Sequence, residues 1–322
     1  MINAAKKDYS NMVSGPTFLK MIIFSVPVIL SGILQLLFSA CDIIVVGNFA
    51  GDASLAAVGS TSSLINLFTN LFIGLSVGSN VLIAHFVGSN DKSKVSLTVH
   101  TSIVLAIICG VFLSVAGFIF ANPILKLMGS PDDVIMLATL YLKIYFLGMP
   151  ALLIYNFGAA ILRAVGNTKH PLYFLTISGV LNILLNLLLV ICFSMGVAGV
   201  AIATVVSEYL SAALIIWYLS EKSEELKLTR SDLKIDPYIL KRVIAIGIPA
   251  GLQGTIFSLS NVVIQSAINS FGSDVVAGNS ATMNIEGFVY MAMNAIYQTA
   301  ITFVGQNYGA GNNEKIRLGT RI

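Results

Sequence analysis

Eight long apolar stretches dominate this sequence and restrict what it can fold into. They cover approximately residues 18–49, 56–87, 95–121, 134–162, 172–192, 197–219, 243–271 and 275–304. Each exceeds the roughly 20 residues with which an α-helix crosses a hydrocarbon core of about 30 Å. Strands of a membrane barrel are about ten residues long and alternate strictly between polar and apolar residues, which these stretches do not do. The sequence therefore predicts an all-α, polytopic bundle of membrane-spanning helices.

The composition favours a lipid bilayer over water as the surroundings. Hydrophobic residues make up 56% of the chain and charged residues only 10%, whereas soluble domains carry about 25% charged residues. The net charge of +3 is too small to indicate a nucleic-acid partner. The three cysteines, Cys41, Cys109 and Cys192, lie in apolar stretches without CxxC spacing. We interpret them as packing residues rather than metal ligands.

The lysines and arginines indicate how the chain is oriented. Sixteen of the 18, all but Lys126 and Lys143, lie before or at the very start of the first stretch or in the breaks that follow the even-numbered stretches. Basic residues concentrate on the cytoplasmic side of membrane proteins. We therefore expect a multi-pass protein of the cell membrane with both termini in the cytoplasm.

A charged stretch divides the chain into two unequal parts. We expect residues 1–220 to form a six-helix lobe, 221–242 a cytoplasmic linker, and 243–322 the first two helices of a second lobe. Several positions near the beginning of the chain recur after the linker at nearly constant spacing: Pro27 as Pro249, Gly32 as Gly254, Gly51 as Gly272, Gly88 as Gly309 and Asp91 as Asn312. Because a unit of six helices is even in number, both copies would enter the membrane from the same side. The pattern therefore predicts a parallel repeat.

A complete second repeat would need about four more helices than the chain contains. We therefore expect the chain to be a C-terminally truncated transporter, and its own activity stays open.

Acids inside apolar stretches are costly and commonly functional. Asp42, Glu208 and Glu286 are the three candidates. Asp42 has no basic neighbour in the sequence, and four apolar residues follow it. Its carboxylate is predicted to need a proton or a sodium ion as a partner when it loses water. The alternative is an acid at the outer interface that reaches water.

Two pairs of polar residues with helical i, i+4 spacing place further oxygen atoms at a depth in the membrane similar to that of Asp42. Asn182 and Asn186 share one face of the fifth span, and Thr204 and Glu208 share one face of the sixth. Together with Asp42 they make a set of hard oxygen donors suited to a small monovalent cation or a proton relay. The alternative for the asparagines is hydrogen bonding between helices.

The remaining ionisable residues receive simpler interpretations. Arg163 is taken as a positive-inside anchor, and His85 and His100 as solvated histidines at the interface. No nucleophile motif, phosphate-binding loop or HExxH pattern occurs, so we do not expect an enzyme.

Several strings in order resemble the multidrug and toxic compound extrusion (MATE) family. GPTFLKMIIFSVPVILSGILQLLFSACDIIVVGNFAGDASLAAVG resembles the opening of these transporters, and AILRAVGNTKHP resembles their turn between helices four and five. LNILLN, GVAGVAIAT and TFVGQNYGAGN resemble parts of their fifth, sixth and eighth helices. The resemblance covers essentially the whole chain.

The resemblance implies twelve helices in two six-helix lobes around a central cleft with alternating access. Family members exchange inward H⁺ or Na⁺ for an outgoing small organic compound, usually cationic or amphipathic. This implies a monomeric antiporter in the lipid bilayer that needs no cofactor beyond the coupling ion.

By position, the resemblance also implies site residues. Asp42, Asn182, Asn186 and Thr204 resemble the cation site of the N-terminal lobe, and Glu208 is a further candidate for binding the cation or proton. Gln35 and Asn156 resemble residues that line the substrate cavity. The DinF-like branch fits best, because the seventh span has no acid, although some members have an aspartate where this chain has Asn186.

Two rival interpretations remain. A lipid-linked oligosaccharide flippase of the same superfamily would line its cavity with several arginines or lysines, and this chain has none well inside a span. The other rival is an inactive fragment that acts as a membrane module.

Overall fold

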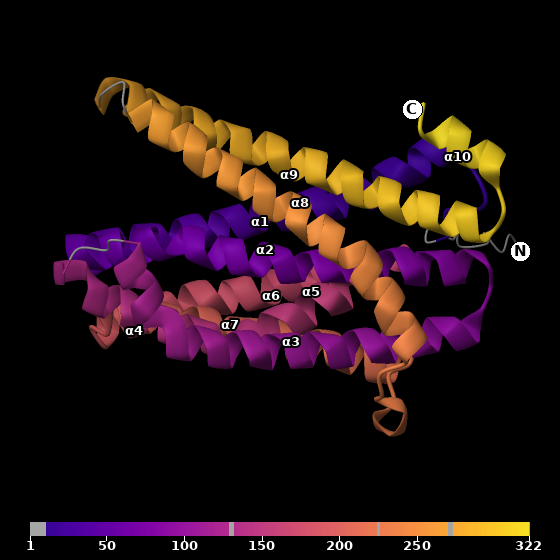
Figure 1. Ribbon diagram of the computed structural model, residues 1–322, viewed down its shortest axis with the longest axis horizontal. Coiled ribbons are helices and arrows are strands. Elements are labelled where there is room, and N and C mark those ends of the chain that lie inside the picture. The colour runs from indigo at the N-terminus through magenta and orange to yellow at the C-terminus, as the bar shows by residue number, and fades with distance from the viewer. Residues whose placement is uncertain (1–10, 129–131, 224–225, 270–272, 322) are drawn as a thin grey trace, which may run out of the picture.

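The described part of the chain is built from helices and contains no strand (Figure 1). The computed structural model describes residues 11–128, 132–223, 226–269 and 273–321. The α-helices are α1 Thr17–Phe49, α2 Asp52–Gly88, α3 Lys92–Leu127, α4 Asp132–Leu147, α5 Met149–Ala164, α6 Lys169–Asn186, α7 Gly196–Trp217, α8 Pro237–Asn269, α9 Ser273–Gly309 and α10 Asn313–Gly319. The π-helical turns Leu187–Cys192 and Tyr218–Lys222 extend α6 and α7, and a 3₁₀ turn occupies Arg230–Asp232.

The predicted membrane spans are mostly present as single helices. On the described residues, α1, α2, α3, α6, α7 and α8 are each long and apolar enough to cross a bilayer. The fourth predicted span is two helices, α4 and α5, bent by 47° where Gly148 and Pro150 interrupt it. The pair makes a seventh span. The polytopic all-α bundle is thereby confirmed.

The eighth predicted span corresponds to α9, which is 37 residues long. On its described residues, α9 is not among the helices that are long and apolar enough to cross a bilayer. The eighth span therefore stays a prediction. Helix α9 also carries polar side chains that are buried against the other helices: Thr299, Thr302, Gln306 and Asn307.

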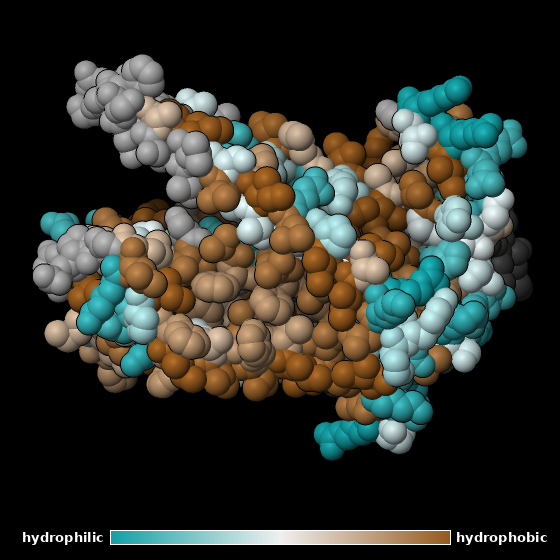
Figure 2. All heavy atoms as spheres, in the orientation of Figure 1, coloured by the Kyte–Doolittle hydropathy of each residue, from teal (hydrophilic) through white to brown (hydrophobic). Residues whose placement is uncertain are grey.

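Helices α1 to α7 form one bundle, and α8 and α9 lie along one side of it (Figure 1). Helix α8 packs mainly on α2, whereas α9 packs on both α1 and α2. The largest apolar core lies within the bundle, where Phe146, Phe157 and Leu142 are fully buried. Apolar residues cover much of the middle of the visible surface, and hydrophilic residues gather at the end that holds α10 (Figure 2).

Helices α2 and α8 touch through their backbones. Gly74 and Gly78 of α2 face Gly247 and Gly251 of α8, and each pair has GxxxG spacing. A Cβ atom at Gly74 would overlap backbone atoms of Gly251, and one at Gly78 would overlap the carbonyl oxygen of Val243. Small residues at this spacing let membrane helices approach closely. This contact fixes the second part of the chain against the first.

Two turns at equivalent positions of the sequence repeat are built in the same way. The Asp91 side chain accepts a hydrogen bond from the backbone N–H of Lys94 at 3.1 Å and begins α3. The Asn312 side chain does the same for Lys315 at 3.2 Å and begins α10. Asn312 and Lys315 are the positions at which Asp91 and Lys94 recur in the second copy of the sequence repeat. These side chains act as N-caps, which satisfy free N–H groups at a helix start.

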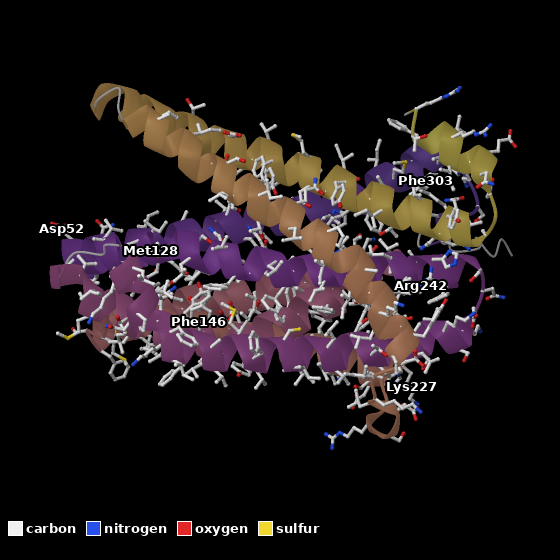
Figure 3. All side chains as sticks on the ribbon, viewed as in Figure 1. Asp52, Met128, Phe146, Lys227, Arg242 and Phe303 are labelled. Carbon is white, nitrogen blue, oxygen red and sulfur yellow. The ribbon has the colours of Figure 1, made fainter. Side chains whose placement is uncertain are left out.

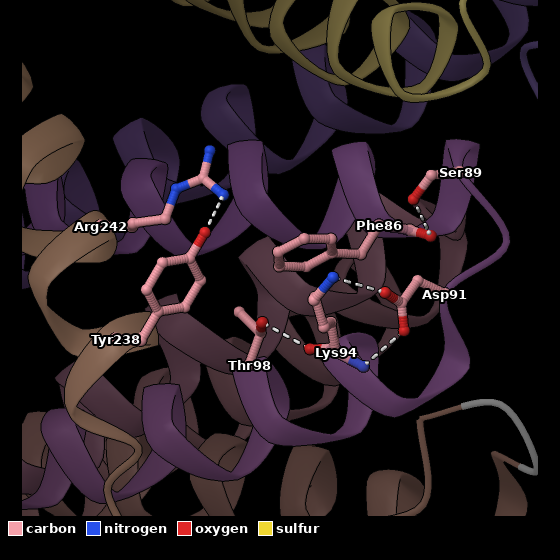
Figure 4. A network of polar contacts seen from close by, with 7 residues as sticks. All are labelled: Phe86, Ser89, Asp91, Lys94, Thr98, Tyr238 and Arg242. Atoms are coloured by element: carbon pink, nitrogen blue, oxygen red, sulfur yellow. Dashed lines mark hydrogen bonds and ion pairs between the residues drawn. The ribbon is translucent and has the colours of Figure 1, made fainter.

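The turn after α2 also carries an ion pair (Figure 4). Lys94 Nζ lies 2.9 Å from the Asp91 carboxylate and 5.6 Å from the centre of the Phe86 ring. The two hydrogen bonds and the ion pair with Lys94 hold the pKa of Asp91 below its usual value. On the neighbouring α8, Arg242 donates a hydrogen bond to the Tyr238 hydroxyl at 3.1 Å.

The segment that precedes α8 lies against α3. Helix α8 begins at Pro237, inside the predicted linker of residues 221–242. The backbone N–H of Thr229 donates to His100 Nε2 at 3.1 Å, and that of Asp236 donates to the Thr101 hydroxyl at 3.1 Å. His100 is only 2% exposed. Its interpretation as a solvated histidine was therefore wrong, because the linker covers it. The division of the chain into 1–220, 221–242 and 243–322 stays a prediction.

Candidate ion and substrate site

Two adjoining cavities lie among the helices. The first, here called the lobe cavity, has a volume of about 310 Å³ and is lined by residues of α1, α2, α4, α5, α6 and α7. The second, here called the central cavity, has a volume of about 350 Å³ and is lined by residues of α1, α2, α5 and α9. Their shared walls are formed by Gln35, Asn66, Thr69, Ile73, Tyr155 and Asn156. Gln35 and Asn156, the two predicted cavity residues, therefore lie where the cavities meet.

The structure brings four of the predicted cation-site residues together at the wall of the lobe cavity. Asn186 Nδ2 donates to Asp42 Oδ1 at 2.5 Å and to Asn182 Oδ1 at 3.2 Å. The Thr204 hydroxyl lies 3.5 Å from Asp42 Oδ2 and 3.5 Å from Asn182 Nδ2. The i, i+4 spacing on α6 places both asparagines on the face that meets α1 and α7. We call these four residues the Asp42 cluster.

On the described wall of the lobe cavity, the Asp42 cluster has oxygen atoms but no basic residue around it. No lysine, arginine or histidine is among the residues that line the lobe cavity. Asn186 is fully buried, and its Oδ1 atom has no hydrogen-bond partner in the described structure. Carboxylate, amide and hydroxyl oxygens are hard donors suited to a small cation or a proton. A buried carboxylate without a basic partner is stabilised when either one binds.

The described residues contain no group of three His, Cys, Asp or Glu side chains placed to hold a metal ion. The Asp42 cluster has only one acid, so its charge matches a monovalent rather than a divalent ion.

Glu208 lines the lobe cavity but stands apart from the Asp42 cluster. Its Oε2 atom is buried without a hydrogen-bond partner and lies where a Cβ atom at Gly148 would have to be. Gly148 is the residue at which α4 and α5 bend. The third predicted acid, Glu286, is exposed on α9 and lines neither cavity.

Sequence reasoning missed several cavity residues. Arg163, interpreted from the sequence only as a positive-inside anchor, also lines the central cavity. Asn294 and Gln298 of α9 line the same cavity, and Tyr145 of α4 lines the lobe cavity. None of these side chains has a sequence signal of its own, because each reaches a cavity only through the packing of helices distant in sequence.

Polar contacts between α2, α5 and α9 join the two parts of the chain. Asn80 of α2 donates to the carbonyl of Ala160 on α5 at 2.9 Å and accepts from Thr302 of α9 at 3.2 Å. Gln306 of α9 donates to the carbonyl of Ala164 at 2.8 Å. Asn80, Thr302 and Gln306 are all buried. These contacts lie toward the end of the molecule that holds the linker and α10.

Comparison with known proteins finds similar sequences and similar structures. A family model described as MatE matches residues 27–188 and 249–321. The two matched stretches begin at Pro27 and Pro249, the pair that first indicated the repeat. The "Probable multidrug resistance protein YoeA" of Bacillus subtilis is 34% identical over 80% of this chain. That match spans 57% of the relative, so the chain spans less than two thirds of its length.

Two solved structures match nearly the whole chain. One is described as the outward-facing conformation of a multidrug resistance MATE family transporter, with a TM-score of 0.89, 26% identity and coverage of 97% of this chain and 69% of that one. The other is a MOP superfamily transporter from Pyrococcus furiosus, whose description states that the reverse polarity of its binding pocket suggests a different function. Its TM-score is 0.89 at 26% identity, with the same coverage of both chains.

Proposed function

This chain belongs to the MatE family of membrane transporters, and we propose that it functions as an ion-coupled exporter of small organic compounds. The observation that carries the proposal is the position of the Asp42 cluster in a cavity that shares walls with the central cavity. An ion bound at Asp42 and a compound bound in the central cavity would both contact α1. This is the physical connection that coupling requires.

Helix α1 connects ion binding at Asp42 with compound binding in the central cavity. Asp42 and Gln35 are seven residues apart, two turns of the same helix face, and Gln35 lines both cavities. A proton or Na⁺ at Asp42 would replace the hydrogen bond from Asn186 and change how α1 sits against α6. We propose that this change alters the walls of the central cavity and alternates its access between the two sides of the membrane.

The location and assembly follow from the same reasoning. We propose that the protein acts as a monomer in the cell membrane, with both termini in the cytoplasm and H⁺ or Na⁺ as the coupling ion. The substrate would be a small organic compound with a cationic group, because the lobe cavity contains Asp42 and Glu208 and no basic residue.

The test is efflux from vesicles that contain the 322-residue chain, with pH and Na⁺ gradients imposed separately and ethidium as the cationic probe. Asp42→Asn keeps the shape of the side chain and removes its charge. We expect gradient-driven efflux by this variant to fall at least about tenfold, with an unchanged melting temperature. Asp52→Asn is the matched control, because Asp52 is exposed at the start of α2 (Figure 3) and lines neither cavity.

The rival functions predict other results. Wild-type efflux by Asp42→Asn would contradict the assigned coupling role, and no efflux under either gradient would favour the non-transporting membrane module. A flippase for polyanionic lipid-linked sugars would need several basic residues, whereas Arg163 is the one lysine, arginine or histidine that lines either cavity.

A further inference from the structure

The central cavity contains a single charged side chain, and that charge is positive. Its polar lining consists of amides, hydroxyls and the guanidinium of Arg163, and no aspartate or glutamate is among the lining residues. The lobe cavity is the reverse, with Asp42 and Glu208 and no base. The two adjoining cavities therefore carry opposite charge.

Arg163 has no partner of its own in the described structure. Its Nε atom is buried without a hydrogen-bond partner, and its side chain forms no hydrogen bond or ion pair with any described residue. The residue as a whole is half-buried, and a buried guanidinium N–H without an acceptor is unfavourable unless a ligand or water completes it. The guanidinium is the group in proteins best suited to a two-pronged contact with a carboxylate.

The carbonyl oxygens on the last turns of α5 accept hydrogen bonds from groups other than Arg163. The carbonyl of Ala160 accepts from the Asn80 side chain and that of Ala164 from the Gln306 side chain. The carbonyl of Arg163 itself accepts from the backbone of Gly166 at 2.8 Å. These bonds place other donors at the carbonyls, and the guanidinium lines the cavity.

The distance of Arg163 from the place where the two cavities meet suits an elongated ligand. Asn156 lies where the two cavities meet, and Arg163 follows it by seven residues on the same face of α5. Seven residues of α-helix correspond to about 10 Å. Each cavity is also in the size range that holds a small organic molecule.

We propose that Arg163 is an anion-binding subsite at the bottom of the central cavity, which binds the carboxylate of zwitterionic compounds whose cationic group lies toward the lobe cavity. This inference rests on the proposed export function and assigns to it a residue that would distinguish compounds with a carboxylate from those without one. Neutral amides between the two charges, at Gln35 and Asn156, would contact the uncharged middle of such a compound.

The binding test uses the 322-residue chain in detergent and two probes that differ in one charge. Norfloxacin carries both an amine and a carboxylate, and its ethyl ester keeps only the amine. We expect Arg163→Gln to weaken norfloxacin binding about tenfold or more, the effect of losing a charge-assisted hydrogen bond, and to leave binding of the ester unchanged. Arg163→Lys should give an intermediate affinity, because lysine keeps the charge but not the planar fork.

A bare anion provides a second readout. Benzoate should raise the melting temperature of the wild-type chain and of Arg163→Lys, and should have a smaller effect on Arg163→Gln. Equal loss of norfloxacin and ester binding in Arg163→Gln would show a general structural role and overturn the subsite. An unchanged norfloxacin affinity in that variant would overturn it as well. If Arg163→Gln does not fold, Arg163→Lys is the deciding variant. Equally weakened binding of norfloxacin and its ester by Arg163→Lys would then overturn the proposal.

Efflux distinguishes the subsite from the function on which it rests. Carboxylate-selective binding that depends on Arg163, without efflux under either gradient, would contradict the export function and support the subsite. Equal efflux of norfloxacin and its ester by Arg163→Gln, at wild-type rates, would contradict the subsite and support the export function.

Discussion

Asp42 and Glu208 line the same cavity, but their side chains have different surroundings. Asp42 accepts hydrogen bonds from Asn186 and Thr204, whose side chains come from two other helices. Glu208 Oε2 has no partner and fills the space beside Gly148. A carboxylate held by several donors is positioned to bind and release an ion, whereas an unpartnered carboxyl inside a bundle is stable in its neutral form.

This difference predicts unequal effects of the same substitution. Glutamine has the shape of a neutral carboxylic acid, so Glu208→Gln should lower gradient-driven efflux by less than about threefold, whereas Asp42→Asn should lower it at least about tenfold. Initial efflux rates from vesicles with equal amounts of each variant would measure the ranking. If Glu208→Gln loses activity as completely as Asp42→Asn, Glu208 takes part in coupling directly.

At the residue scale, the sequence predicts local patterns but not distant partners. Asn182 and Asn186 are recognisable because they share one face of one helix, and the structure places them together beside Asp42. Arg163 could not be recognised in the same way. It lies at the end of α5, where a basic residue ordinarily reaches water, and only the packing of α9 across it creates the cavity that it lines.

Among the elements, α2 and α8 make the closest approach. Gly74, Gly78, Gly247 and Gly251 look like isolated glycines in the sequence, yet they form two facing GxxxG pairs. Their meaning could not be inferred from either helix alone, because glycine in a membrane helix also permits bends. The helices themselves were predictable from length and apolarity, and the broken fourth span shows the limit of that reasoning at Gly148.

The close approach predicts different effects for two identical substitutions on α8. A Cβ atom at Gly251 would overlap the backbone carbonyl of Leu71, which cannot move without the whole helix, so Gly251→Ala should destabilise the chain by about 1–3 kcal/mol. Gly254→Ala is the matched control. Its Cβ atom would lie 3.7 Å from Asn70 Cβ, an ordinary contact, and it should be neutral or stabilising by up to about 1 kcal/mol. Melting temperatures in detergent would measure both, and equal values would contradict the backbone contact.

At the scale of the whole molecule, equivalent contacts relate the two parts of the chain. A Cβ atom at Gly32 would meet the side chain of Met291, and the residue nearest to one at Gly254 would be Asn70. Gly254 is the counterpart of Gly32 in the second repeat, and Met291 is separated from Asn70 by nearly the same stretch of sequence. Contacts that repeat in this reciprocal way indicate a pseudo-twofold relation between the repeats. The central cavity has walls from both repeats and was not visible in either one alone.

The two ends of the molecule differ in charge, and this predicts its orientation in the membrane. Figure 3 places Lys227 and Arg242 toward the end opposite to Asp52 and Met128. Basic residues concentrate on the cytoplasmic side, so the end with the linker and α10 should face the cytoplasm.

Cysteine labelling can test this orientation in a variant whose three native cysteines are replaced by serine or alanine. Asp52→Cys and Lys227→Cys are suitable positions, because both side chains are exposed. With a membrane-impermeant maleimide, Asp52→Cys should react in intact cells and Lys227→Cys only after the cells are permeabilised. The cysteine-free variant measures background labelling. The reverse pattern would invert the orientation, and with it the side on which the Asn80, Thr302 and Gln306 contacts join the two parts of the chain.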